Sequence, residues 1–397
     1  MLGMALTMLM GDRAKYAGLL FGLAFTSFLV TFAMSFLSGF LTRGFALITE
    51  NPADVWVMDL TVQSDELTTN MPASALARVR SVAGVQSALP LALGTAEARF
   101  PNGRFQSFQV IGVGDSTLGG VPPMKGGATA GVLRAPDAVI VDSGGTRGKL
   151  QTPLLKADQW SYGKPDADAP TRPLARGDEL LVNDHLVWVA GRSEGRPRFP
   201  PRLLMYTTFS NADRILLPER RRLTFVLATA APGIIPRELA ARIEAQTGLR
   251  ARTSEDFKAD TVRWYLANSE DVEDVGWMLA LAAVIGLGVT GVMLSMFTSE
   301  NLWQYAVLSA MGATPQILLT MIFAQAGLCA LLGTGIGIGL CAIVGQLSAI
   351  VAHYPFRMMW FAPVFGGTTI VLVSVIAAAL SARPVLKLQP MVVFERR

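Results

Sequence analysis

Long apolar stretches stand near both ends of the chain, and a long polar region separates the first from the others. A helix of about 20 apolar residues spans a bilayer, and four stretches reach that length: 17–41, 275–297, 316–344 and 361–382. The fourth is followed by Arg383 and Pro384, and proline ends a helix because it lacks the amide hydrogen that the next turn requires. The pattern therefore predicts four transmembrane helices.

The first stretch has an alternative interpretation as a cleaved signal peptide. Such a peptide has an apolar core of about 7–15 residues, followed by an A-x-A cleavage site. Residues 17–41 form a longer core, and no A-x-A site follows it. We therefore interpret residues 17–41 as a membrane helix.

Residues 42–274 show the shorter patterns of a folded polar domain. Partial alternation of apolar and polar residues predicts strands, at 54–60, 105–113, 138–142, 180–190 and 223–229. Helical periodicity that begins with a proline predicts helices over 72–79 and 236–247. The predicted fold class is an α-helical four-span membrane domain with an α+β extracytoplasmic domain, of one or two lobes, inserted between the first and second spans.

Composition supports the membrane assignment. Hydrophobic residues make up 51% of the chain and charged residues only 16%, against about 25% charged residues in soluble domains. So high an apolar content excludes intrinsic disorder. The chain has two histidines and two cysteines, too few for most metal sites or a disulfide framework. Cys329 and Cys341 both fall in the third predicted span, where the intervening helix keeps them about 18 Å apart.

The distribution of charge predicts the orientation in the membrane. The chain has 34 basic and 30 acidic residues. Regions 1–41 and 275–397 together hold 7 basic and 3 acidic residues, so residues 42–274 hold 27 of each kind. Arg357 is the single basic residue of loop 345–360, whereas the two tails carry Arg13, Lys15, Arg383, Lys387, Arg396 and Arg397. Positive charges stay on the cytoplasmic side, so both termini are predicted inside and residues 42–274 outside. The pI of 9.2 then reflects membrane topology, and no nucleic-acid partner is expected.

Three features of the polar region could be mistaken for binding or active sites. Residues 143–150 (SGGTRGKL) have serine and leucine where a phosphate loop needs glycine and a serine or threonine. His185 lies in an apolar run and is interpreted as a structural residue. A basic group is interpreted as a solvated face, with binding of anionic headgroups or a partner as the alternative; its members are Arg192, Arg196, Arg198, Arg202 and Arg220–Arg222. We expect no catalytic, cofactor-binding or metal-binding residues in this chain.

Glycines recur at every second position of the third predicted span, at 333, 335, 337 and 339. No strand precedes them, so the context excludes a dinucleotide-binding motif. Gly335 and Gly339 have the spacing of a small-x-x-x-small face, which lets two membrane helices approach closely. We predict that they pack either against another helix of the same chain or against a second copy of the chain.

The layout of the spans and two motifs resemble one family. Residues 300–314 (ENLWQYAVLSAMGAT) are similar to a segment of FtsX-like ABC transporter permeases that reads approximately E-R-x-R-E-I-A-V-L-R-A-L-G-A-S. Residues 382–394 (ARPVLKLQPMVVF) resemble the family's terminal A-x-R-A-x-R-L-x-P-x-x-x-L, and residues 9–16 (LMGDRAKY) resemble its entry into the first helix. The inserted region is similar in style to the periplasmic core of MacB-type and DevC-type permeases.

The resemblance implies that residues 298–315 form a coupling helix, which lies in a cleft of an ATPase subunit. The residues expected to couple are Glu300, Trp303, Tyr305, Leu308 and Gly312. Leu302, Tyr305 and Leu308, with Val307 less well aligned, are spaced to line one apolar face, and Gly312 supplies a C-terminal stop. Basic residues that the family has here are absent, so a hydrophobic contact by Trp303 is expected to replace them. The alternative is an interfacial connector without a partner.

The resemblance also implies the partners. No phosphate loop occurs in the sequence, so a separate ATPase chain is expected to bind ATP and Mg²⁺, and this chain is expected to need no cofactor. Four spans per subunit imply a permease dimer, of like or unlike chains. A periplasmic adaptor (a membrane fusion protein) and an outer-membrane duct are further expected partners.

Two functions from different classes remain open. The first is a permease of the bacterial inner membrane that exports or extracts a lipid, glycolipid or other hydrophobic compound by mechanotransmission. The second is an FtsX-type signalling module that regulates a periplasmic cell-wall hydrolase. The large inserted region favours the first. Spans without charged residues indicate helices that pack and transmit force, because routes for ions usually keep ionisable groups. The predicted order is a cytoplasmic amphipathic segment 1–16, a span 17–41, the periplasmic domain 42–274, a span 275–297, the cytoplasmic coupling helix 298–315, a span 316–344, a periplasmic loop 345–360, a span 361–382 and a cytoplasmic tail 383–397.

Overall fold

The computed structural model of the chain describes residues 13–127, 129–146, 148–154, 170–217 and 223–386. It consists of two compact units: a membrane unit made of Met1–Phe40 and Ser269–Arg397, and an inserted unit, Leu41–Asn268. Some residues used in the sequence analysis lie outside the described residues, namely Lys387, Arg396, Arg397 and Arg220–Arg222.

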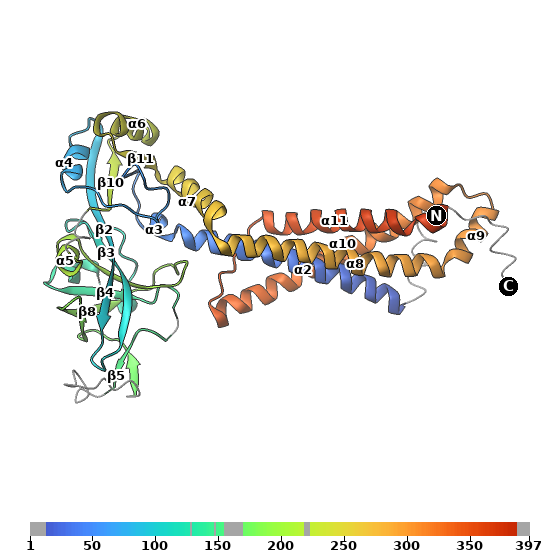
Figure 1. Cartoon of the computed structure of the whole chain (residues 1–397), viewed down its shortest axis with the longest axis horizontal. Coiled ribbons are helices and arrows are strands. Elements are labelled where there is room, and N and C mark those ends of the chain that lie inside the picture. Colours follow the sequence, from blue (N-terminus) through green and yellow to red (C-terminus); the bar gives the residue numbers. More distant parts are fainter. Residues whose placement is uncertain (1–12, 128, 147, 155–169, 218–222, 387–397) are drawn as a thin grey trace. The chain divides into compact units, whose positions relative to one another are not determined.

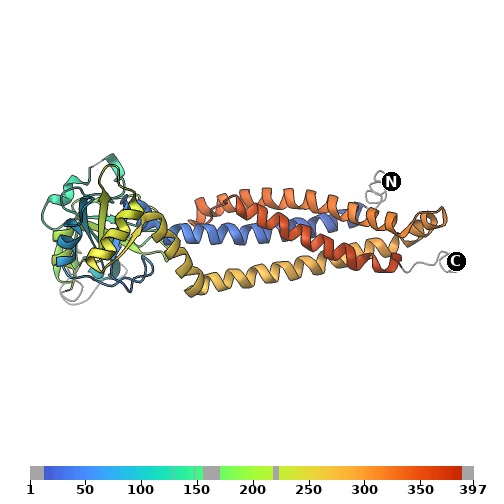
Figure 2. The ribbon, with the colours of Figure 1, turned by 90° about the horizontal axis from the view of Figure 1, so that it is seen from above.

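The membrane unit is a bundle of long apolar helices that run side by side (Figures 1 and 2). Within the described residues, four helices have the length and hydropathy to cross a membrane, which confirms the predicted four-span architecture. They are α2 (Arg13–Gly44), α8 (Glu270–Glu300), α10 (Pro315–Ala352) and α11 (Phe361–Ser381), with α9 (Leu302–Ala310) between α8 and α10 and α12 (Arg383–Leu386) after α11. The chain is an integral membrane protein.

Two helices extend well past the predicted apolar stretches. Helix α8 begins at Glu270, ahead of residue 275, and α10 continues to Ala352, through part of the predicted loop 345–360. Hydropathy marks only the apolar part of a helix, whereas backbone hydrogen bonding continues into polar residues. The first turn of α8 carries acidic residues, which the positive end of the helix dipole stabilises.

Helix α2 is the central helix of the bundle. In its candidate span 56% of the residues are buried, against 22%, 28% and 39% in the spans of α8, α10 and α11. Glycines let the neighbours approach it: a Cβ on Gly286 of α8 would overlap Thr26, and one on Gly366 of α11 would overlap Thr31. The buried hydroxyls of Thr26 and Ser35 in α2 donate to the helix's own backbone, to the carbonyls of Gly22 at 2.8 Å and Thr31 at 2.7 Å.

The inserted unit is built on one mixed sheet. Within the described residues it has nine strands in the order β11-β1-β10-β2-β3-β9-β4-β8-β7. Their bounds are β1 (Val55–Met58), β2 (Val85–Arg99), β3 (Phe105–Val113), β4 (Ala138–Asp142), β7 (Glu179–Val182), β8 (His185–Arg192), β9 (Leu203–Thr208), β10 (Phe225–Ala230) and β11 (Arg250–Thr253). Strands β5 (Gln151–Pro153) and β6 (Thr171–Pro173) form a separate pair.

The sheet forms two lobes that share the long strand β2. At one end of the sheet, β7 also pairs with β2. Strands β2, β3, β9, β4, β8 and β7, in that order, therefore close into a small barrel, which is filled by side chains such as Phe108 and Met205. Helix α5 (Phe209–Ile215) packs against this barrel. At the other end, β1 alternates its side chains between two faces: Val55 and Val57 belong to one hydrophobic cluster, and Trp56 and Met58 belong to another.

Helices cover both faces of this second lobe (Figure 1). Helices α4 (Ser74–Arg80) and α6 (Pro236–Thr247) contribute to the cluster of Val55 and Val57. Helices α3 (Ala46–Glu50) and α7 (Ser254–Asn268) contribute to the cluster of Trp56. The predicted α+β fold class is confirmed, and the unit has two lobes.

Several parts of the sheet differ from the sequence-based prediction, which missed strands β2, β9 and β11. The single strand expected over residues 180–190 is a hairpin of β7 and β8, because Asn183 and Asp184 take φ values of 44° and 65°, which suit a two-residue turn. His185 therefore stands exposed at the hairpin rather than inside an apolar strand. Strand β2 escaped prediction because Pro90 and Gly94 interrupt its pattern.

Candidate functional site

Helix α9, between the second and third spans, turns one side into the bundle. Tyr305 and Ala306 are fully buried. Tyr305 belongs to the membrane unit's core, and Leu302 and Leu308 pack against that core while remaining partly exposed. The apolar face predicted to enter an ATPase cleft is thus covered by the chain's own helices.

Tyr305 fixes α9 to α10. Its hydroxyl donates a hydrogen bond to Oε1 of Gln325 at 3.2 Å, and both side chains are buried. Burial raises the pKa of Tyr305 to about 12, so the hydroxyl keeps its proton and remains a donor near neutral pH. This hydrogen bond therefore joins α9 to α10.

The other side of α9 is exposed and largely apolar. Trp303 is 44% exposed and Met311 is 69% exposed. Gln304, which follows Trp303 in the sequence, is also exposed. Glu300, the last residue of α8, is also exposed. We name Glu300, Trp303, Gln304 and Met311 the outer surface of α9. Sequence reasoning had included Glu300 and Trp303 but missed Met311, because only the tertiary packing shows which side of α9 is exposed.

Gly312 ends this helix as predicted. It has a φ of +96°, its N–H donates to the carbonyl of Ser309, and the N–H of Ala313 donates to the carbonyl of Leu308, both at 3.0 Å. This pair of bonds is the Schellman arrangement, which needs a residue that tolerates positive φ after the helix. The turn into α10 is therefore fixed rather than flexible.

The inserted unit holds its two ends together. The C-terminal end of α2 reaches Gly44, where an added Cβ would lie 2.6 Å from the ring of Tyr265 in α7. The Tyr265 hydroxyl in turn donates to the carbonyl of Phe199 at 3.2 Å. The segment that follows α2 and the helix that precedes α8 are thus in contact.

A buried ion pair strengthens this contact region. Glu50, the last residue of α3, accepts a hydrogen bond from Nη2 of Arg198 at 2.6 Å, and the two side chains are 9% and 6% exposed. Tyr206 donates to the same carboxylate at 3.2 Å. Removing one partner of a buried pair typically costs about 3–5 kcal/mol, so α3 is held firmly. We name Gly44, Glu50, Arg198 and Tyr265 the base clamp.

Two ion pairs correct the prediction of a solvated basic face for Arg198 and Arg202, whereas Arg196 is exposed as predicted. Arg198 is buried in the base clamp, and Arg202 pairs with Glu66 at 2.6 Å. Asp65 is also buried here, and its Oδ1 has no hydrogen-bond partner among the described residues. Burial raises the pKa of Asp65 to about 7, against the lowering effect of Arg198 and Arg202.

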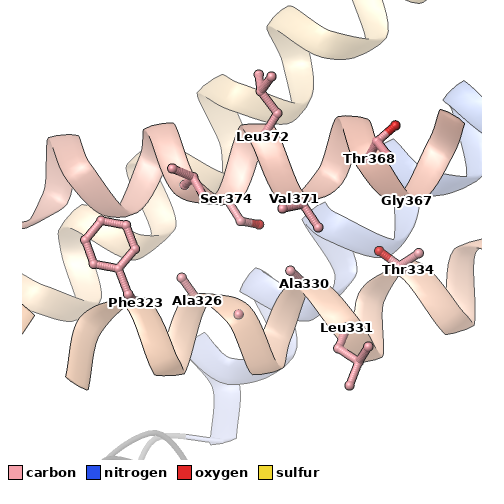
Figure 3. Close-up of a pocket in the computed structure, with 12 residues that line it drawn as sticks. Phe323, Ala326, Ala330, Leu331, Thr334, Gly367, Thr368, Val371, Leu372 and Ser374 are labelled. Carbon is pink, nitrogen blue, oxygen red and sulfur yellow. The ribbon is translucent and has the colours of Figure 1, made fainter. Parts of the chain in front are cut away.

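An apolar groove of about 750 Å³ runs between α10 and α11 (Figure 3). In Figure 3 it is lined from α10 by Phe323, Ala326, Ala330, Leu331 and Thr334 and from α11 by Gly367, Thr368, Val371, Leu372 and Ser374. The Ser374 hydroxyl is buried, and it has no hydrogen-bond partner in the described part of the chain. The groove can take a long apolar chain that also offers one hydrogen-bond acceptor.

The glycines of α10 divide between two faces. Gly333 and Gly337 lie against α2, where a Cβ on either would overlap Leu23 or Ala24. Gly335 and Gly339 have no such neighbour, since a Cβ on either would have no described atom within 4 Å. Gly335 and Gly339 thus have no close neighbour among the described residues, and their packing against a second copy stays a prediction.

These features define a polytopic membrane protein with a polar unit inserted after its first span and an exposed helix between its second and third spans. Residues 276–390 match the family model described as FtsX-like permease C-terminal. The match covers residues 300–314 and 382–390, on which the resemblance rests, and the membrane part of the chain is thus similar to the C-terminal part of FtsX-like permeases.

Two solved structures are similar to the inserted part of the chain. The periplasmic region of MacB from Actinobacillus actinomycetemcomitans is 12% identical, with a TM-score of 0.34 over 53% of this chain and 94% of that chain. The extracellular domain of the noncanonic ABC-type transporter YknZ from Gram-positive bacteria is 13% identical, with a TM-score of 0.31 over 51% and 98% of the two chains. No curated protein matches the chain significantly.

Proposed function

We propose that this chain is the permease subunit of an ABC transporter that exports or extracts a hydrophobic compound, such as a lipid or glycolipid, on the periplasmic side of a bacterial inner membrane. A separate ATPase chain binds ATP and Mg²⁺ and contacts the outer surface of α9. The basic tails support a cytoplasmic position for both termini and for α9. Two permease copies act together, with a periplasmic adaptor and an outer-membrane duct as further partners.

The base clamp is the observation that carries this proposal. A polar unit joined to its membrane helices by loose linkers would not follow their movements. Here two contacts hold the first and last segments of the unit in place. They are the contact of Gly44 with Tyr265 and the buried ion pair of Glu50 with Arg198. We infer that a displacement of α2 is passed to the segments of the inserted unit that the base clamp joins.

The contacts inside the membrane unit supply the earlier steps. ATP binding by the partner displaces α9, and the Tyr305–Gln325 hydrogen bond passes the displacement to α10. Helix α10 acts on α2 through the close contacts of Gly333 and Gly337. Packed helices transmit such shifts because close-packed interiors do not deform continuously.

The substrate class rests on the membrane unit. Its four apolar stretches carry no charged residue, and a charged substrate crossing between them would lack the groups that usually stabilise it. The groove between α10 and α11 instead offers apolar walls and the Ser374 hydroxyl. These features favour a lipid-like compound that is handled from the membrane or on the outer side, without a central aqueous pore.

Purification from native membranes tests the proposal. A tagged copy of the chain is expected to retain a P-loop ATPase, and the purified complex is expected to hydrolyse ATP. Retention of an adaptor in the same complex supports export, whereas retention of a peptidoglycan hydrolase supports the FtsX-type signalling module. A chain that purifies intact, without any ATPase and without ATP hydrolysis, would show the proposal to be wrong.

A further inference from the structure

A pocket in the inserted unit gathers three arginines around one buried carboxylate. It lies beside β11 and α7 and has a volume of about 370 Å³. Arg250, Arg252 and Arg263 line it together with Asp260 and Trp264. None of these residues belongs to the base clamp, and the sequence analysis did not single out the arginines.

Asp260 cannot balance the charge of the pocket. Its side chain is 7% exposed, and its Oδ2 lies 2.8 Å from Nη2 of Arg250 and 3.1 Å from Nε of Arg252. Its Oδ1 contacts Nη2 of Arg263. One negative charge therefore faces three positive charges, and these four side chains carry a net charge of +2.

Several arginine donors in the pocket remain unused. The buried Nε of Arg250 has no hydrogen-bond partner among the described residues, whereas the buried Nε of Arg252 is ion-paired with Asp260 at 3.1 Å but lacks hydrogen-bond geometry. Leaving charged donors buried and unsatisfied is unfavourable. The side chains of Arg252 and Arg263 are 41% and 73% exposed, so a ligand can reach their other N–H groups. A second anion in the pocket would satisfy both the charge and the donors.

The chemistry of the pocket selects a phosphate group. Guanidinium forks bind the oxygens of phosphate in pairs, and three arginines can surround one such group. Asn268, which also lines the pocket, is followed in the sequence by Ser269 and then by the membrane helix α8. Trp264 in the wall is of a residue type enriched at membrane–water interfaces. We propose that this pocket binds the phosphate of an anionic phospholipid headgroup.

The test compares phosphatidylglycerol binding by matched variants of the full chain. The chain is reconstituted in phosphatidylcholine nanodiscs that contain phosphatidylglycerol, and bound lipid is counted by native mass spectrometry. The double variant Arg252→Gln/Arg263→Gln is expected to bind phosphatidylglycerol about tenfold more weakly, because it loses charge-assisted hydrogen bonds. The control is Arg176→Gln, an exposed arginine outside the pocket, and it is expected to bind like the unchanged chain.

A second arm uses inorganic phosphate, added to the chain in neutral detergent. Weak phosphate binding, together with the loss of lipid in the double variant, supports the headgroup. Phosphate binding as tight as that of the lipid assigns the pocket to a soluble phosphate compound and overturns the headgroup. Equal lipid binding by the double variant and the unchanged chain overturns the site. Occupation of the pocket by an acidic peptide of a partner protein, instead of lipid, also overturns it. If the double variant fails to fold, Arg263→Gln alone, at a side chain 73% exposed, carries the test with an expected loss of about threefold.

Discussion

Gly337 and Gly335 are two residues apart in α10 but have opposite surroundings. Gly337 lies against Ala24 and Ser27 of α2, whereas a Cβ on Gly335 would have no described atom within 4 Å. We predict that Gly337→Val destabilises the protein by about 1–3 kcal/mol, because the added side chain forces the two helices apart. Gly335→Val is the matched control, and the unfolding temperature of its monomeric form in detergent is expected to stay unchanged. Equal unfolding temperatures for the two variants would contradict the assignment of the packed face.

Asp65 is predicted to make the stability of the inserted unit depend on pH. Burial raises its pKa to about 7 from an ordinary value of 3.8. The folded state therefore binds more protons than the unfolded state between these values, so the contribution of Asp65 is complete below about pH 4 and is lost as the pH rises through about 7. At pH 8, Asp65→Asn is expected to be more stable than the unchanged protein by on the order of 2–4 kcal/mol.

Chemical unfolding at pH 5 and pH 8 measures this difference. The variant and the unchanged protein are expected to differ much less at pH 5, where Asp65 is already protonated in the folded state. A variant that is less stable than the unchanged protein at pH 8 would show that the Asp65 carboxylate is well paired with Arg198 or Arg202.

Single residues were the hardest features to predict from the sequence. The repeat GTGIGIG places glycines on two faces of one helix, since two residues turn a helix by about 200°. Both faces have the same spacing, so the sequence does not show that 333 and 337 are the packed pair. Arg198 likewise stood in a basic group, and its buried partner Glu50 is far away in the sequence.

At the scale of elements, α9 makes the most direct prediction. Trp303 and Met311 belong to its outer surface, whereas Leu308 packs partly on the chain's own core. Trp303→Ala/Met311→Ala is expected to reduce ATPase retention at least tenfold with normal thermal stability, because exposed apolar anchors dominate binding. Leu308→Ala is the matched comparison, and it is expected to lower stability by about 1–2 kcal/mol and to retain the ATPase. The reverse pattern would place the ATPase contact on the other side of α9.

Elements with one strong signal were predicted well, and elements with mixed signals were not. The four membrane helices followed from hydropathy, and α6 followed from a proline start and a clear period. The side of α9 that faces a partner did not follow, because apolar residues lie all around this helix. Strand β2 needed tertiary pairing on both sides to hold Pro90 and Gly94 in an extended conformation.

At the scale of the whole molecule, the account predicts which side of the membrane each unit faces. Both native cysteines are fully buried, so an introduced cysteine can be labelled selectively. Arg176→Cys, at an exposed turn of the inserted unit, is expected to react with a membrane-impermeant maleimide in intact spheroplasts. Gln304→Cys on α9 is expected to react only after permeabilisation. Labelling of both positions from the same side would contradict the topology.

The central claim is that movement at α9 reaches the inserted unit through the base clamp. Spin labels on Ser87→Cys, an exposed position of β2, report the distance between the inserted units of two copies in the assembled complex. We predict that trapping ATP in the partner shifts this distance in the unchanged complex and in the control Leu266→Ala, an exposed position of α7. The shift is expected to disappear in Tyr265→Ala, which removes the ring against Gly44. The same distance with and without ATP, or a full shift in Tyr265→Ala, would contradict the account.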